Sequence, residues 1–132
     1  MKKIISFVFV CLFGMMIFSC SSTKNIPEDL SAPQLLQQGQ SFYDMADYKT
    51  AEAYYLRALE NYGDNIETYI EVKYELAHLY NKTGNYEKAY IHLDEILNLY
   101  DYSRAGELPP AYKKLSQIEL AKIPENKLPK NK

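Results

Sequence analysis

Residue types that carry much of the covalent chemistry of enzymes are scarce in this chain. Its 132 residues include two cysteines, two histidines and no tryptophan. The sequence also lacks a Gly-x-Ser-x-Gly nucleophile motif and a glycine run of the kind that binds phosphate. No nucleophile, base and orienting group can be assembled from these residues. We therefore expect a protein that is not an enzyme and that uses no cofactor or small-molecule substrate.

An excess of positive charge is also missing. The formal net charge is −2, so nothing in the composition indicates binding to nucleic acid. The aromatic residues divide the chain into two parts: four of the five phenylalanines come before residue 20, whereas all 13 tyrosines come after it. The first twenty residues therefore differ in kind from the rest of the chain.

The N-terminal segment has the pattern of a secretory signal. Lys2 and Lys3 precede the uncharged stretch 4–18, which is shorter than the roughly 20 residues of a membrane-spanning helix. The sequence Ile17-Phe18-Ser19-Cys20 resembles the lipobox of bacterial lipoprotein precursors. This resemblance implies that residues 1–19 are removed and that Cys20 is acylated. A plain signal peptide or an uncleaved anchor, with Cys20 incidental, is the alternative.

The lipobox resemblance also implies a location. A lipid on Cys20 would hold the protein on a bacterial cell membrane, and Ser21 and Ser22, in place of Asp, favour the outer membrane. Which face of the membrane the protein occupies is left open. Residues 20–31 are polar, include Pro27 and have no helical period, so we expect a flexible tether there.

Helical periodicity and capping signals follow the tether. Ser31 and Gln34 form a capping-box pattern, and Asp47 and Asp64 are the expected caps of later helices. The predicted helices cover about 32–45, 48–62, 65–82, 86–100 and 109–122. Together they predict an all-α domain over residues 32–123, followed by a disordered tail over 124–132.

Two parts of this domain share one order of small and aromatic residues. The small residues are twelve positions apart and the aromatic residues six apart, in the pairs Gly39/Ala51 and Ala77/Ala89, then Phe42/Tyr48 and Tyr80/Tyr86. This pattern resembles the tetratricopeptide repeat, TPR. The resemblance implies antiparallel helical hairpins, with two repeats and a C-terminal closing helix, five helices in all. In the closing helix we expect Tyr112, Leu115, Ile118 and Ala121 to face the core, with Leu115 and Ile118 contributing to stability.

The TPR resemblance also implies a concave binding face lined by the first helix of each repeat. Transferred by repeat position, it comprises Gln37, Gln40, Tyr43, Asp44, Glu71, Tyr74, Glu75, His78, Asn81, Lys82, Lys113, Lys114 and Gln117, with Leu36 beside them. Tyr74 is the expected anchor, flanked by Gln40, His78 and Lys114. The family's clamp for C-terminal carboxylates is absent, because Leu36, Gln40, Tyr74 and His78 occupy its Lys and Asn positions.

A metal site was the other candidate for this region. Glu75 and His78 have the Glu-x-x-His spacing of di-iron bundles, but Ala89 precedes His92 where a second motif would need Glu. We therefore expect no metal, and a solvated helix face around Glu71, Glu75 and His78. The sequence favours a lipid-anchored TPR adaptor that binds another protein in the bacterial cell envelope, as a scaffold or accessory subunit. The alternative is a structural lipoprotein that self-associates and has no groove function.

Overall fold

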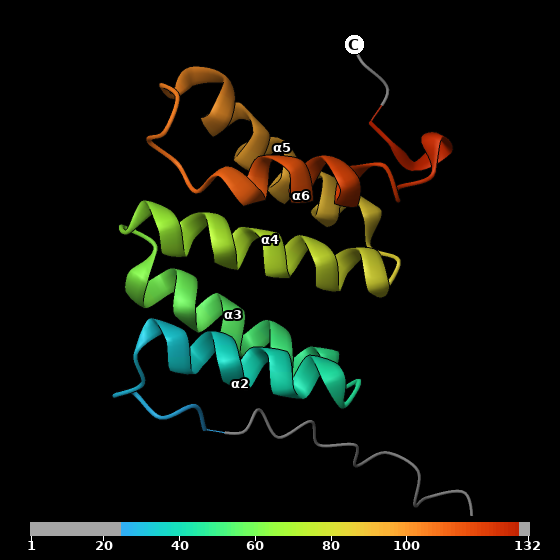
Figure 1. Cartoon of the computed structure of the whole chain (residues 1–132). Coiled ribbons are helices and arrows are strands. Elements are labelled where there is room, and N and C mark those ends of the chain that lie inside the picture. The colour runs from blue at the N-terminus through green and yellow to red at the C-terminus, as the bar shows by residue number, and fades with distance from the viewer. Residues whose placement is uncertain (1–24, 130–132) are drawn as a thin grey trace, which may run out of the picture.

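The computed structural model describes residues 25–129, and this part of the chain contains helices and no strand (Figure 1). The helices, labelled as in Figure 1, are α2 (Ala32–Asp44), α3 (Tyr48–Tyr62), α4 (Ile66–Lys82), α5 (Tyr86–Tyr102) and α6 (Pro110–Leu120), with a short 3-10 helix at Glu125–Lys127. The predicted all-α class with five α-helices is confirmed for these residues. The signal segment 1–19, Cys20 and residues 130–132 lie outside the described part.

The helices stack as hairpins. α2 packs on α3, α4 packs on α5, and α6 lies against both α4 and α5 (Figure 1). α2 and α4 also touch, so α2, α4 and α6 lie side by side along one edge of the stack. None of the helices in the described part is both long and apolar enough to cross a membrane.

Small residues allow the close helix contacts that the sequence predicts. Gly39 of α2 lies against the ring of Tyr55, and a Cβ atom at Gly39 would be only 2.4 Å from Tyr55 Cε1. Ala51 in the first hairpin and Ala77 and Ala89 in the second are fully buried. The hairpins therefore close because one side of each contact carries almost no side chain.

Both hairpins use the same turn. The chain reverses through a residue with positive φ, which is Ala46 (59°) in the first hairpin and Gly84 (78°) in the second. The next residue, Asp47 or Asn85, donates its backbone N–H to a carbonyl five positions back, at 2.9 and 2.8 Å. This hydrogen bond closes a Schellman-type helix end, in which the left-handed residue is normally glycine.

Two helix ends differ from the sequence predictions. Asn65, not Asp64, caps α4, because its side chain accepts a hydrogen bond from Thr68 N at 3.0 Å. α5 runs to Tyr102 rather than ending near Tyr100. Its last turn is continued by the backbone bond from Ser103 N to the Leu99 carbonyl, at 3.0 Å.

The two segments that flank the helices are more closely packed than predicted. Ile26 and Leu30, in the expected tether, pack against the core, and the Tyr62 hydroxyl donates to the Leu30 carbonyl at 2.8 Å. At the other end Ile123 is buried, and Leu128, in the expected disordered tail, packs on the core. Apolar side chains thus bring both segments onto the helices, for burial removes them from water.

The predicted register of α6 is wrong. Leu115 and Ile118 are 37% and 49% exposed, whereas Ser116 and Glu119 are 0% and 1% exposed. The small Ser116 lets α6 lie close to its neighbours, and Glu119 finds hydrogen-bond donors on α4. Leu115 and Ile118 therefore do not provide the core contacts that the sequence pattern predicts, and Ala121 is exposed as well.

Candidate functional site

The residues expected on the concave face come from the three helices that lie side by side. Eight are partly buried: Gln40, Tyr43, Glu71, Tyr74, Glu75, His78, Asn81 and Lys113. Five are exposed: Gln37, Asp44, Lys82, Lys114 and Gln117. The structure brings most of the first group together in two neighbouring places, a cleft and a polar cluster.

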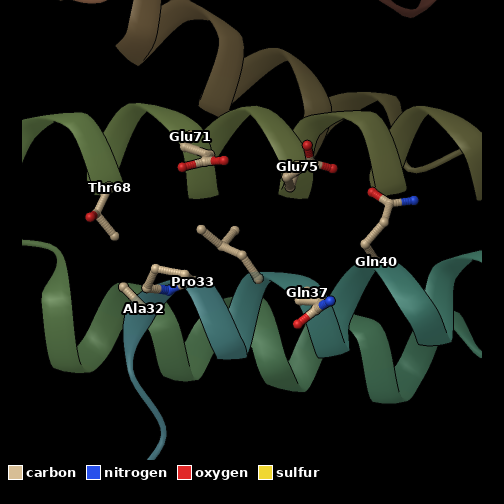
Figure 2. A pocket seen from close by; sticks show the side chains of 8 residues that line it. Ala32, Pro33, Gln37, Gln40, Thr68, Glu71 and Glu75 are labelled. Atoms are coloured by element: carbon tan, nitrogen blue, oxygen red, sulfur yellow. The ribbon is translucent and has the colours of Figure 1, made fainter.

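The cleft lies between α2 and α4, and we call it the α2–α4 cleft (Figure 2). Its volume is about 360 Å³, and it is lined by Ala32, Pro33, Leu36, Gln37, Gln40, Thr68, Glu71 and Glu75. α2 supplies an apolar wall, while α4 supplies two carboxylates and a hydroxyl. Figure 2 shows Gln40 extending from α2 toward α4. The cleft therefore combines an apolar side with an acidic side.

Glu75 of the cleft lies in an environment that disfavours its charged form. Burial raises the pKa of Glu75, and the negative charge of Glu71 raises it further, while the nearby His78 opposes the rise. On α6, burial raises the pKa of Tyr112, and the charges of Glu71 and Glu75 raise it further. The expectation of a solvated helix face is therefore wrong for Glu71, Glu75 and His78, which are all partly buried.

The polar cluster joins α2, α4 and α6 through His78. The Tyr43 hydroxyl lies 2.9 Å from His78 Nε2, and His78 Nδ1 lies 3.2 Å from Glu119 Oε1. Tyr43 and His78 also contact each other through their rings, with centroids 5.2 Å apart. One imidazole thus connects the first helices of both hairpins to the closing helix.

Glu119 is the buried acceptor of this cluster. The Asn81 side-chain amide donates to the Glu119 backbone carbonyl at 2.9 Å and to the Glu119 carboxylate at 3.0 Å. Lys122 Nζ lies 2.6 Å from Glu119 Oε2. Burial tends to raise the pKa of Glu119, but the bonds from Lys122 and Asn81, together with the charge of His78, hold it below its usual value. Glu119 therefore remains ionised and ties α6 to α4.

Tyr74 lies in the middle of the concave face, as expected, but with different neighbours. Its ring stacks on His78 with centroids 6.3 Å apart and an interplanar angle of 11°, and it meets the edge of Tyr112 at 5.6 Å. Burial raises the pKa of its hydroxyl. The flanking residues are thus His78 and Tyr112, in place of Gln40 and Lys114.

Several predicted residues lie apart from these two places. Lys113 Nζ lies 3.7 Å from Asp101 of α5, on the side of α6 away from the α2–α4 cleft. Gln40 donates to Asp44 at 2.8 Å, within α2. Within residues 25–129, no three or more His, Cys, Asp and Glu side chains are grouped so that they could hold a metal ion.

Sequence reasoning missed Glu119 on this face, and it assigned Tyr112 only to the core. The sequence signal for them was Ser116, a small residue that corresponds to Gly39 and Ala77 in the two hairpins. Aligning α6 on that small residue, rather than on its apolar side chains, places Glu119 together with Tyr112 on the buried side.

Comparison with known proteins identifies a family. Residues 22–93 match the model of the family described as "Protein of unknown function (DUF2989)", and this match includes α2, α3, α4 and the first part of α5. A protein of Treponema pallidum (strain Nichols), described as "Uncharacterized protein", is 32% identical over 110 residues, which cover 81% of this chain and 44% of the relative. The chain thus spans less than half of that relative's length. No solved structure matches. Because the family match covers more than half of the chain, the protein belongs to the DUF2989 family.

Proposed function

We propose that this protein is a lipid-anchored, TPR-like adaptor that binds another protein of the bacterial cell envelope along the face formed by α2, α4 and α6. The α2–α4 cleft is the observation that carries this proposal. It offers an apolar wall beside polar groups, which suits the side chains and backbone of a polypeptide. Tyr74 lies on the same face and is the aromatic anchor of the proposed interface.

The polar contacts between the three helices support the role of this face as a rigid binding surface. Tyr43, His78 and Glu119 join the three helices through short contacts, at 2.9 and 3.2 Å. A surface that is held in place before binding loses less conformational entropy when the partner docks. The polar cluster therefore holds the helices around the cleft in place, and the side chains that line the cleft contact the partner.

The anchor is tested at Cys20. Acylation should give the mature protein a lipid mass on Cys20 and place it in the detergent phase. The variant Cys20→Ser should either move to the aqueous phase or remain as an uncleaved precursor, as judged by mass spectrometry and phase partition. Mature protein without lipid on Cys20 would refute the anchor but not the binding face.

The binding face is tested by cross-linking in cells. A photoreactive amino acid replaces Gln37, which lines the cleft. The matched control has the same amino acid in place of Glu87, an exposed residue of α5 outside the cleft. The adaptor function predicts a specific adduct with a different polypeptide from Gln37 and not from Glu87. Adducts from both positions, or from neither, would contradict a binding face along α2, α4 and α6.

Tyr74 gives a quantitative test once that polypeptide is identified. Tyr74→Ala should weaken its binding roughly thirtyfold, which corresponds to about 2 kcal/mol, because central aromatic residues commonly dominate an interface. Tyr102→Ala is the matched control, since Tyr102 is 91% exposed at the end of α5. Circular dichroism must show that both variants stay helical. Equal affinities for the two variants would exclude Tyr74 as the anchor.

One observation favours self-association as a second candidate function. Leu115 and Ile118 are 37% and 49% exposed on the outer side of α6, where a further helix could pack. In this case the Gln37 position would give no adduct with a different polypeptide. Light scattering on the detergent-solubilised protein would show a dimer or larger species, which Leu115→Gln/Ile118→Gln should dissociate.

A further inference from the structure

Several carboxylates in the described part of this protein are paired with lysines of the same chain. Lys73 Nζ lies 2.5 Å from Glu95, Lys88 Nζ lies 3.6 Å from Glu52, and Lys122 Nζ lies 2.6 Å from Glu119. A partly buried carboxylate loses hydration, and a nearby cation compensates for that loss. The chain therefore supplies its own counter-ion to each of these three carboxylates.

The α2–α4 cleft is the exception. Glu71 and Glu75 are one helical turn apart on the same side of α4, and within the described residues neither forms an ion pair with a lysine or arginine. Their neighbours are the Tyr112 and Tyr55 phenols and, for Glu75, the imidazole of His78. Like charges at this spacing repel each other. The free protein thus holds two partly buried negative charges with no lysine or arginine between them.

We infer that the α2–α4 cleft recognises an arginine or lysine side chain of the bound polypeptide, with Glu71 and Glu75 as its counter-ions. The inference rests on the proposed function, since it names the chemistry of the polypeptide that the cleft binds. Arginine fits better than lysine, because its planar guanidinium can donate to two carboxylates at once. A carboxylate of the partner would be repelled at the same place.

The opposite wall of the cleft suits the rest of such a side chain. Ala32, Pro33 and Leu36 of α2 line the cleft together with Glu71 and Glu75 of α4. Figure 2 shows Ala32 and Pro33 on α2, across the cleft from Glu71 on α4. The hydrocarbon stem of arginine or lysine covers apolar surface while its charged end reaches polar groups. Gln37 and Thr68, which also line the cleft, can hydrogen-bond to the backbone of the same polypeptide.

A pair of peptides that differ only in charge tests the inference. Acetyl-Ala-Ala-Arg-Ala-Ala-amide and the same peptide with citrulline, the neutral isostere of arginine, are titrated into the full-length, 15N-labelled protein in detergent micelles. The arginine peptide should shift the amide signals around Leu36, Gln40, Thr68 and Glu75 and bind at least about tenfold more tightly than the citrulline peptide, the preference of a charge-assisted hydrogen bond over a neutral one.

Two double variants with the same change of net charge complete the design. Glu71→Gln/Glu75→Gln should remove the preference for arginine, so that both peptides bind with the affinity of the citrulline peptide. Glu87→Gln/Glu125→Gln is the matched control, because Glu87 and Glu125 are exposed and lie outside the cleft. This control should keep the preference for arginine.

Each other outcome overturns the inference. Equal binding of both peptides in the cleft means that the cleft takes a polypeptide without reading its charge. Equal losses in both double variants mean diffuse electrostatic attraction. Mg²⁺ displacing the arginine peptide at equal concentration means a general cation site. The absence of shifts with either peptide also overturns it, while the Gln37 cross-link decides the adaptor function separately.

Discussion

The hairpins α2–α3 and α4–α5 are two versions of one design, offset by 38 residues, and they differ where they contact their neighbours. Leu35 of the first hairpin corresponds to Lys73 of the second. Leu35 is fully buried, and Lys73 is only 8% exposed. The same backbone position thus accepts either an apolar or a charged side chain. Its surroundings decide which one is stable.

The second hairpin provides partners that the first hairpin lacks at that position. Lys73 Nζ lies 2.5 Å from Glu95 and 5.1 Å from the centre of the Tyr69 ring. An ion pair and a cation–π contact together replace the hydration that the ammonium loses. The comparison teaches that the repeat pattern sets where side chains point, while the neighbouring helix sets their chemistry.

Giving each hairpin the other's residue at this position should have the largest effect on the free energy of unfolding. Leu35→Lys places an unpaired charge in the core and should lower the free energy of unfolding by about 3–5 kcal/mol. Lys73→Leu should change it by less than about 1 kcal/mol, because an apolar residue of similar volume can replace a buried ion pair and the Glu95 side chain, 41% exposed, can regain water. Guanidinium denaturation of the full chain in detergent, followed by circular dichroism, measures both. Similar losses in the two variants would contradict the comparison.

The close contact inside each hairpin should show the next largest effect. Gly39 meets Tyr55, and the equivalent pair in the second hairpin is Ala77 and Leu93. Gly39→Ala should destabilise the protein by about 2 kcal/mol, because its Cβ atom would overlap the buried Tyr55 ring. Ala77→Gly is the reverse control and should cost only about 1 kcal/mol through lower helix propensity.

A double variant sharpens that test. Gly39→Ala/Tyr55→Leu gives the first hairpin the residue pair of the second. Its loss of stability should be about 1–2 kcal/mol smaller than the sum of the two single losses, because the overlap is relieved. Additive losses would mean that the 2.4 Å contact between Gly39 and Tyr55 does not limit this position.

Acid should separate α6 from the second hairpin before it separates the two hairpins from each other. The pKa of Glu119 is lower in the folded protein than in the unfolded chain, so its contribution to stability is present at neutral pH and is lost as the pH falls below the usual range of a glutamate. The loss should be on the order of 1.5 kcal/mol, the value of a hydrogen bond to a charged group.

Hydrogen exchange of the α6 amides between pH 6 and pH 3, corrected for intrinsic rates, measures this effect. Protection in α6 should fall before protection in α2 and α3. Glu119→Gln should already show the weaker protection at pH 6 and little further change on acidification. Glu75 acts in the opposite direction, because its raised pKa favours the folded protein as the pH falls. Simultaneous loss of protection in all helices would contradict the prediction.

The turns should show the smallest effect. Ala46→Gly should raise the free energy of unfolding by about 0.5–1 kcal/mol, because Ala46 adopts φ 59°, which glycine tolerates without strain. Gly84→Ala should lower it by about 1 kcal/mol for the same reason. Thermal melting of both variants beside the wild type measures the difference. Shifts of equal sign would show that the two turns are not equivalent.

The helices and hairpins could be predicted from the sequence because their signals are local. α3 covers Tyr48–Tyr62, as predicted, and the positions of Gly39, Ala51, Ala77 and Ala89 predict which helices lie close together. Spacing along a helix determines which side chains share a face, and small residues determine where two helices can approach. Both properties belong to short stretches of chain.

The sequence alone therefore determined the all-α class, the five helices of the described residues and most of the candidate binding face. Only the tertiary structure decided the rotation of α6, the burial of Glu119 and the packing of Ile26 and Leu128. Apolar periodicity favoured Leu115 and Ile118 as the buried side of α6. The actual side is set by Asn81 and Lys122, which donate to the Glu119 carboxylate, and by His78, whose Nδ1 lies 3.2 Å from it. A charged residue can be buried when other parts of the chain hydrogen-bond to it, and no local sequence pattern predicts such long-range hydrogen bonds.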